Sequence, residues 1–230
     1  MRIRSFIISY ALVLAIVLFA DRRPNHAQTS DRYSHVVDLT DGKSGRDSVN
    51  AGRTGIIAPD ALIPGTWTAG QIPPERLVAP LVVMDLNVAP PSQISLDDIA
   101  NWETEHGAVP QGAVVAIRQN GRLKSTGQSS QTSDDQFPMT SQAAEFLMDA
   151  RYTTGFAVGN QADLNSDRAF ARQVALHGNY VVEGAAGLTS LPASGSLIIV
   201  APAKMAGGAN VSAKNKQSRT TPVRVLAMVR

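Results

Sequence analysis

The chain has 230 residues, of which 43% are hydrophobic and 17% charged, and these values suit one globular domain with a sizeable core. Its 21 Lys and Arg residues barely exceed its 19 Asp and Glu residues, and no basic patch with interleaved aromatic residues occurs, so nucleic acid is not an expected partner. The absence of cysteine excludes disulfides, thiolate metal ligands, a cysteine nucleophile and a lipidated cysteine.

The amino terminus has the layout of a secretory signal peptide. Arg2 and Arg4 precede an apolar and small-residue run that ends at Ala20, and a polar segment follows. The run is shorter than the roughly 20 residues that a membrane-spanning helix usually needs. We therefore predict a signal peptide over residues 1–20, cleaved as late as residue 27, and a periplasmic or secreted product. If the leader stays uncleaved, it is the expected membrane anchor.

Residues 21–34 are polar and lack periodicity, which predicts a disordered lead-in before a domain that spans residues 35–230. A first strand is expected at His35–Leu39. The stretch from Arg53 to Leu77 is dense in Gly and Pro, which favours an ordered loop and argues against a regular helix or central strand. We expect Trp67 to anchor this loop by burying its ring against the sheet.

The remaining chain alternates between apolar runs and amphipathic segments. Strands are predicted at residues 81–86, 114–118, 154–158, 181–183, 197–200 and 223–229. Helices are predicted at residues 95–105, 141–151 and 166–177 from their caps and apolar stripes, and polar loops at 42–50, 121–135 and 207–221. Because these elements do not follow a strict βαβ order, we predict a single α/β domain with a mixed β-sheet packed by helices.

Several segments resemble landmarks of the cyclase family, the group that includes bacterial kynurenine formamidases. They are HVVDLT from His35, IPGTWTAGQIPPERLVAPLVVMDL from Ile63, HGAVPQGAVVAIR from His106, FPMTSQAAEFL from Phe137, VVEGAAGLTSLPASGSLIIVAPAKMAGG from Val181 and TPVRVLAMV from Thr221. The resemblance implies a kynurenine-formamidase-like fold, a homodimer or higher homo-oligomer, and metal-dependent hydrolysis of an amide or ester with Zn or Mn.

The family motif His-x-Gly-Thr-His-x-Asp-x-Pro, with a further His shortly after it, is not present. In a register that matches the family's Ala-Pro to residues 58–59, its positions hold Ala51 and Gly55 for the histidines, Ile57 for the aspartate and Ala61 for the catalytic histidine. In a register anchored on Gly55 as the motif glycine, Arg53 replaces the first histidine and Ile57 the second. Both registers lose the histidines.

The resemblance places the remaining family ligands in the carboxyl-terminal half. Glu183 matches the family glutamate, whereas Ala171 stands at the matching upstream histidine position. His177 lies six residues further along the predicted helix, a rotation of about 240°, so we expect a partly buried histidine near the helix end and not a ligand. A buried Glu183 needs a partner, and we expect a structural ion pair with Arg53 or Arg224, while a vestigial ligand role stays open.

Asp38, Asp41, Asp60, Asp163 and Asp167 show no calcium-loop spacing, and no GxSxG elbow supports a serine hydrolase. We therefore expect a vestigial pocket without a cofactor, because a metal site normally needs three or more protein ligands. Its predicted residues are Arg53, Ile57, Asp60, Ala61, Ala171 and Glu183. Two hypotheses remain: a non-catalytic protein that binds a small molecule there, or an arylformamidase-type hydrolase with a relocated metal site.

Overall fold

The computed structural model describes residues 33–41, 54–86, 93–119, 139–159, 168–203 and 220–230. The predicted signal peptide, most of the lead-in, Arg53 and most of the predicted polar loops lie outside these residues. Within Tyr33–Arg230, the described residues form one compact unit. No helix in the described ranges is long and apolar enough to cross a bilayer.

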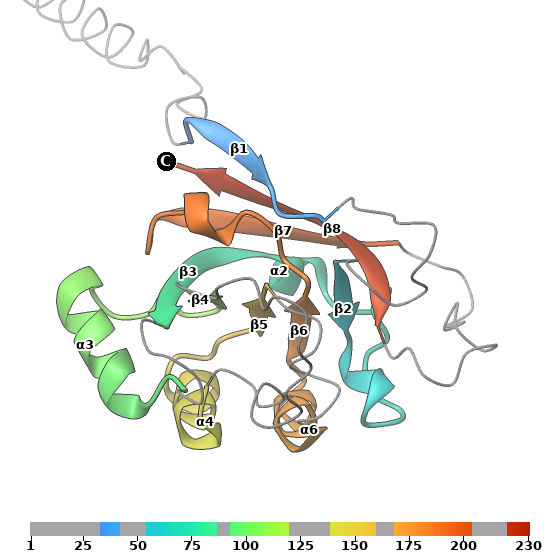
Figure 1. Cartoon of the computed structure of the whole chain (residues 1–230). Coiled ribbons are helices and arrows are strands. Elements are labelled where there is room, and N and C mark those ends of the chain that lie inside the picture. Colours follow the sequence, from blue (N-terminus) through green and yellow to red (C-terminus); the bar gives the residue numbers. More distant parts are fainter. Residues whose placement is uncertain (1–32, 42–53, 87–92, 120–138, 160–167, 204–219) are drawn as a thin grey trace, which may run out of the picture. The chain divides into compact units, whose positions relative to one another are not determined.

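The described strands form one mixed eight-stranded sheet in the order β1-β8-β2-β6-β5-β4-β3-β7, which a β7–β8 pairing closes into a barrel (Figure 1). The neighbours β3, β4, β5 and β6 run parallel, and every other pairing is antiparallel. The strands are β1 (His35–Asp38), β2 (Gly55–Ile57), β3 (Val78–Leu86), β4 (Val114–Gln119), β5 (Gly155–Val158), β6 (Tyr180–Glu183), β7 (Ser196–Pro202) and β8 (Thr221–Val229). The predicted α/β domain with a mixed sheet is confirmed.

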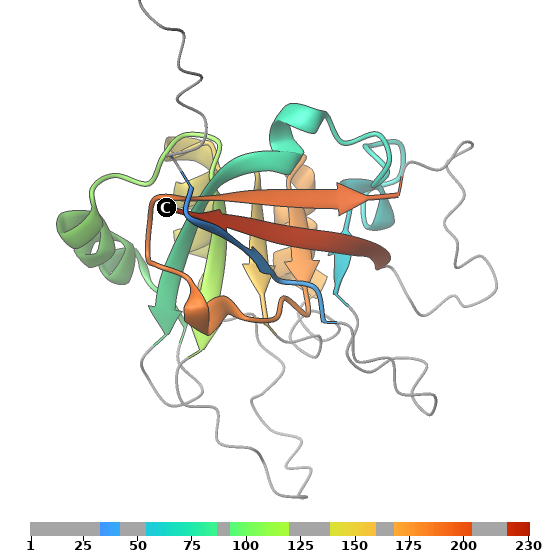
Figure 2. The same ribbon diagram turned by 90° about the horizontal axis from the view of Figure 1, so that it is seen from above.

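Strand β8 closes the barrel because it pairs with three other strands. Its first two residues pair with β2, its residues 223–228 pair with β7, and its residues 226–229 pair with β1. Figure 2 shows β7, β8 and β1 crossing over the parallel strands. Thr220, the residue just before β8, is therefore held beside Gly55 of β2.

Three helices cover the outer face of the parallel strands (Figure 1): α3 (Leu96–His106), α4 (Ser141–Ala150) and α6 (Arg168–Leu176). The short elements are α2 (Pro74–Leu77) and the 3₁₀ turns η1 (Pro59–Ala61) and η2 (Leu188–Ser190). Helix α3 begins at the predicted capping box, in which the Ser95 hydroxyl accepts from the Asp98 amide at 3.3 Å and the Asp98 carboxylate accepts from the Ser95 amide at 2.8 Å. Local capping chemistry thus fixes where α3 begins.

Side chains point alternately to the two faces of each strand, and this creates two apolar layers. On β6, Tyr180 and Val182 pack inside the barrel, whereas Val181 packs toward the helices. Because successive side chains of a strand point to opposite faces, Glu183 points toward the helix side. A carboxyl group is thereby placed in a largely hydrocarbon layer.

Two expectations for the Gly- and Pro-rich stretch are wrong. Residues 55–57 form a central strand, held between β6 and β8, because the first proline of the stretch comes only after the strand has ended. The Trp67 ring packs against Arg76 and near Gly178, and 39% of the residue stays exposed. The stretch also ends in helix α2, which begins with Pro74 at its first turn.

Strand β3 begins at Val78, earlier than the predicted start at residue 81. It runs through Pro80, which lacks a backbone donor, at a place where β3 pairs only with β7. Pairing with β4 begins at Leu81, so the missing donor of Pro80 leaves that ladder intact.

Candidate functional site

The candidate site lies where β2 and β6 pair beside α6. Gly55 is opposite Glu183 and Ile57 is opposite Val181, and residues directly opposite each other in a sheet share a face. The turn η1 follows β2 and contacts α6, which brings Ala61 and Ala171 into the same apolar cluster as Ile57. The structure therefore brings Ile57, Ala61 and Ala171 into one apolar cluster, and Glu183 lies on β6 two residues beyond Val181, the residue opposite Ile57.

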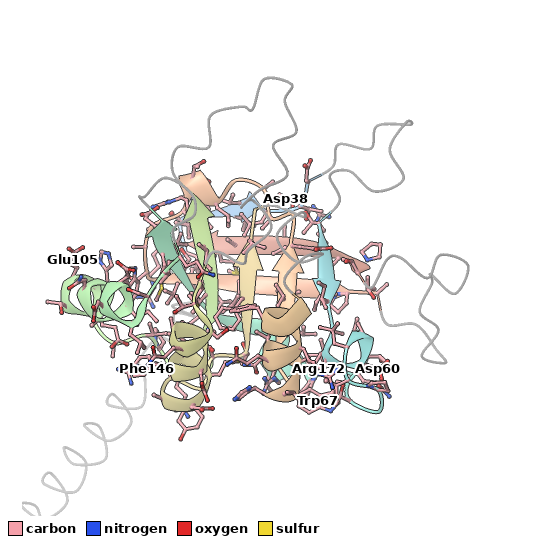
Figure 3. The ribbon with its side chains drawn as sticks, turned by 60° about the horizontal axis from the view of Figure 1, so that its bottom comes forward. Asp38, Asp60, Trp67, Glu105, Phe146 and Arg172 are labelled. Atoms are coloured by element: carbon pink, nitrogen blue, oxygen red, sulfur yellow. The ribbon has the colours of Figure 1, made fainter. Side chains whose placement is uncertain are left out.

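The other two predicted pocket residues do not join this group. Asp60 lies on η1 but its carboxylate accepts from the Gly65 amide at 3.1 Å, and its own amide donates to the Trp67 carbonyl at 3.1 Å. Figure 3 shows Asp60 and Trp67 on the side of the molecule where Arg172 of α6 also lies. Asp60 thus shapes the turn. Arg53 lies outside the described residues, and so does the predicted Arg53–Glu183 pair.

Glu183 is 6% exposed, and its described hydrogen-bond partner is the Thr220 hydroxyl, which donates to Oε1. Burial raises the pKa of Glu183, and the Thr220 hydrogen bond partly opposes that rise. The predicted alternative pair with Arg224 is wrong. The Arg224 side chain lies on the exposed side of β8 and pairs with Asp38 at 3.1 Å.

Gly55 makes room for the partner of Glu183. A Cβ added to Gly55 would lie 2.0 Å from Cγ2 of Thr220, a distance that real atoms do not tolerate. Thr220 therefore occupies the space beside a position that matches a family histidine in one register. No local pattern signals this contact, because Thr220 lies 37 residues from Glu183 and only the β6–β2–β8 order brings them together.

The buried residue Thr54 links the segment around Glu183 to the chain just after β1. The Thr54 hydroxyl donates to the Gly184 carbonyl at 2.7 Å and accepts from the Asp41 amide at 2.7 Å. Thr40 forms a β-bridge to Ala185 on the same rim. These contacts hold the carboxyl end of β6 in place, so the position of Glu183 is set by backbone and hydroxyl groups.

The residues at this corner do not fit the Zn or Mn ion that the family resemblance implies. Such ions normally take three or more imidazole or carboxylate donors, whereas Ile57, Ala61 and Ala171 offer hydrocarbon. Across the described ranges, no group of three or more His, Asp and Glu side chains could hold a metal ion. Glu183 alone among the four pocket residues supplies an oxygen donor of the right kind.

His177 follows α6 and lies partly buried at the helix end, as the sequence predicted. Its Nδ1 lies 2.9 Å from the Gln173 carbonyl oxygen, and its Nε2 lies 3.2 Å from a carboxylate oxygen of Asp149 on α4. About a third of the side chain is exposed, at 31%. The imidazole thus joins two helix ends.

A second polar cluster, which sequence reasoning missed, lies at the opposite end of β6. Nη2 of Arg76 donates to the Gly178 carbonyl at 3.3 Å and to Oδ1 of Asn179, and its guanidinium carbon lies 5.3 Å from the centre of the Trp67 ring. The Tyr180 hydroxyl donates to the Arg76 carbonyl at 2.7 Å. Burial lowers the pKa of Arg76 and raises the pKa of Tyr180.

Comparison with known proteins agrees with this architecture. The family model described as "Putative cyclase" matches residues 50–162, which run from just before β2 to just after β5. The match covers 113 of the 230 residues, so the middle of the chain is similar to the cyclase family. A search of curated proteins finds no match.

Solved structures of several hydrolases share the fold. Isatin hydrolase A from Labrenzia aggregata, bound to benzyl benzoate, is 28% identical, with a TM-score of 0.59 over 77% of this chain and 72% of that one. Isatin hydrolase A from Ralstonia solanacearum is 24% identical, with a TM-score of 0.61 over 85% and 81%. A predicted metal-dependent hydrolase from Bacillus stearothermophilus is 21% identical, with a TM-score of 0.51 over 85% and 87%. The latter two show likeness of fold alone.

Proposed function

We propose that this chain is an exported, non-catalytic member of the cyclase family whose metal centre has degenerated. The observation that carries the proposal is the corner around Glu183. The carboxyl at the family glutamate position is buried against the Thr220 hydroxyl, and Ile57 and Ala171 stand where the family resemblance places metal ligands. One carboxyl among hydrocarbon side chains gives a divalent ion too few ligands.

The chemistry that the resemblance implies depends on those ligands. A hydrolytic metal ion polarises a carbonyl or lowers the pKa of a bound water, and a nearby base then moves the proton. At this corner the position of the base is Ala61, which carries no titratable group. We therefore propose a binding role for the pocket, in which a small molecule contacts the apolar side chains and the Glu183 carboxyl.

The rival function is an amide or ester hydrolase with a relocated site. The names of the structural relatives suggest isatin as its substrate, and the kynurenine-formamidase resemblance suggests N-formylkynurenine. Elemental analysis after dialysis, followed by assays of both compounds with added Mn²⁺ and Zn²⁺, separates the two functions. We expect no stoichiometric metal and no turnover above background.

One metal per chain, with turnover that Glu183→Ala abolishes and Glu145→Ala leaves intact, would establish the rival instead. Glu145 is an exposed residue on α4 and serves as the matched control.

Export is tested separately by mass spectrometry of the native protein. We expect a mature chain that begins between Asp21 and Ser30, because the polar segment starts there. Intact Met1 in the membrane fraction would mean an uncleaved anchor. A full-length product in the cytoplasm would contradict export.

A further inference from the structure

The pairing of β2 with β6 places three positions on one patch of the sheet. Gly55 lies directly opposite Glu183, and Ile57 follows Gly55 by two residues and lies opposite Val181. Successive side chains of a strand point to opposite faces, so positions 55 and 57 share the face of Glu183. Residues directly opposite each other have Cβ atoms about 5 Å apart. Donor side chains at positions 55, 57 and 183 would therefore converge on one point.

Thr220 meets this patch with both branches of its side chain. A Cβ built on Gly55 would overlap the Cγ2 methyl group of Thr220 and would lie 3.3 Å from its Cβ. The Thr220 hydroxyl donates to Oε1 of Glu183, which is buried. The methyl group thus fills the space in front of position 55, while the hydroxyl holds the carboxyl group opposite that position.

The backbone after Thr220 keeps its side chain in this place. Thr221 pairs with Ile56 and Pro222 pairs with Gly55 in the ladder between β8 and β2. The ladder begins one residue after Thr220, so this residue is anchored at the point where β8 joins the sheet. Its contacts at the patch follow from the strand order β6-β2-β8 and are part of the fold.

We propose that Thr220 closes this corner against metal ions, so that the lack of a metal seat has two causes, missing ligands and a filled space. The inference rests on the proposed function and gives it a physical cause. If missing ligands were the only cause, two histidines added beside Glu183 would be enough to bind a metal ion. If Thr220 also fills the site, a third change is needed.

Histidines at positions 55 and 57 supply the test. Together with the Glu183 carboxylate they make a set of two imidazoles and one carboxylate, which is a known donor set for Zn²⁺. The purified full-length protein with Gly55→His and Ile57→His is prepared in three forms: with Thr220 intact, with Thr220→Ser and with Thr220→Ala. Calorimetry measures the affinity for Zn²⁺, and the visible absorption of bound Co²⁺ reports the coordination of the ion.

The three forms separate the methyl group from the hydroxyl. The form with Thr220→Ala should bind one Zn²⁺ per chain at least about tenfold more tightly than the form with Thr220 intact, because both branches are gone. Thr220→Ser removes the methyl group and keeps the hydroxyl for Glu183, so its affinity should lie between the other two. Equal affinity in all three forms overturns the proposal.

Two controls show whether Glu183 takes part. In the Thr220→Ala form, Glu183→Gln should abolish Zn²⁺ binding because the carboxylate is removed. Glu145→Gln makes the same change on an exposed position of α4 and should leave binding intact. Circular dichroism and denaturation midpoints establish that each form is folded before metal is added. A folded Thr220→Ala form that binds no Zn²⁺ also overturns the proposal, since the three donors then do not converge.

A second series covers a histidine pair that does not fold. Gly55→Cys with Ile57→His places a smaller thiolate donor at position 55, and the same three forms at Thr220 are then compared under reducing conditions. The wild-type chain keeps the two proposals apart. Stoichiometric metal on the wild type would overturn the proposed function, whereas a metal-free wild type with affinities that do not depend on Thr220 would overturn this inference alone.

Discussion

The two ends of β6 present opposite electrostatic problems. At the carboxyl end, Glu183 is a buried acid whose described partner is a neutral hydroxyl. At the amino end, Arg76 is a half-buried base whose described contacts are neutral as well. Glu103 and Arg151, by contrast, solve the same problem within the chain by forming a two-point ion pair at 2.7 Å.

The difference between the ends lies in what each group can do about its charge. A carboxyl group can bind a proton, and burial favours the protonated form of Glu183 by raising its pKa. Arginine has no such option, because its guanidinium keeps its charge throughout the physiological pH range. Substitutions at each end can test this contrast.

The largest effect is expected from Gly55→Ala at the Glu183 end. The new methyl would lie 2.0 Å from Cγ2 of Thr220, so Thr220 must move and its hydrogen bond to Glu183 is lost. Overpacking together with a buried acceptor left without its donor should lower the free energy of unfolding by about 3 kcal/mol. Urea denaturation measures this.

The double variant Gly55→Ala with Thr220→Ser tests the mechanism of that loss. Serine keeps the hydroxyl for Glu183 and removes the clashing methyl, so the double variant should recover most of the lost stability. An equal loss in the single and double variants would show that the contact between Gly55 and Thr220 is not the cause.

A smaller effect is expected from Trp67→Ala at the Arg76 end. The ring covers Arg76 but is 39% exposed, so the cost should be about 2 kcal/mol, below the range for a fully buried aromatic. Val36→Ala, at an exposed hydrophobic residue on β1, should change stability by less than about 0.5 kcal/mol.

The ion pair between Glu103 and Arg151 is the reference for charges that are paired within the chain. Glu103→Gln should lower the free energy of unfolding by about 1 kcal/mol at neutral pH. The hydrogen bond from Arg151 lowers the pKa of Glu103, so the folded chain holds fewer protons on this group than the unfolded chain. The pair's stabilisation is therefore present above the ordinary carboxyl pKa and is lost as pH falls through the lowered pKa. Denaturation of both proteins from neutral to acid pH should show the difference vanish; a constant difference would exclude the ion pair as its source.

Local sequence signals were sufficient for much of the fold. The helix predicted at residues 95–105 from its cap and apolar stripe matches α3 nearly to the residue, and the apolar run predicted at residues 81–86 covers most of β3. The segments that resemble the cyclase family indicated the family and the α/β architecture. These features are local because they depend on residues a few positions apart.

The site was only partly predictable because its contacts are not local. The family resemblance placed Ile57, Ala61, Ala171 and Glu183 in one pocket, and the structure puts the first three in one apolar cluster while the pocket itself stays a prediction. Neither Thr220 as the partner of Glu183 nor the Arg76 cluster could be read from sequence, since each depends on strand order and on a contact between segments far apart in the chain. The density of Gly and Pro also hid the central strand β2, because a three-residue strand has too short a pattern to outweigh them.

The smallest effect, and the one of opposite sign, is expected from Glu183→Gln. Burial raises the pKa of Glu183, so between the ordinary carboxyl pKa and the raised value the folded chain binds more protons than the unfolded chain. Wild-type stability should therefore fall as pH rises through that window, with a slope of at most about 1.4 kcal/mol per pH unit, and the loss should persist at higher pH. Glutamine keeps the shape and an oxygen acceptor for Thr220 but never acquires the charge. The variant should match the wild type in acid and be slightly more stable at neutral pH, the reverse of Glu103→Gln.

Denaturation midpoints of the wild type and Glu183→Gln, measured from acid to neutral pH, decide whether the two ends of β6 differ in this way. The Glu103→Gln variant, measured over the same pH range, is the matched control. The wild-type Glu103 carboxyl has a lowered pKa, so this variant should be less stable than the wild type at neutral pH, which is the opposite sign to Glu183→Gln. A Glu183→Gln chain less stable than wild type at neutral pH would mean that the Glu183 charge is paired after all. The carboxyl end of β6 would then hold a charged site, and the contrast with the Arg76 end would fail.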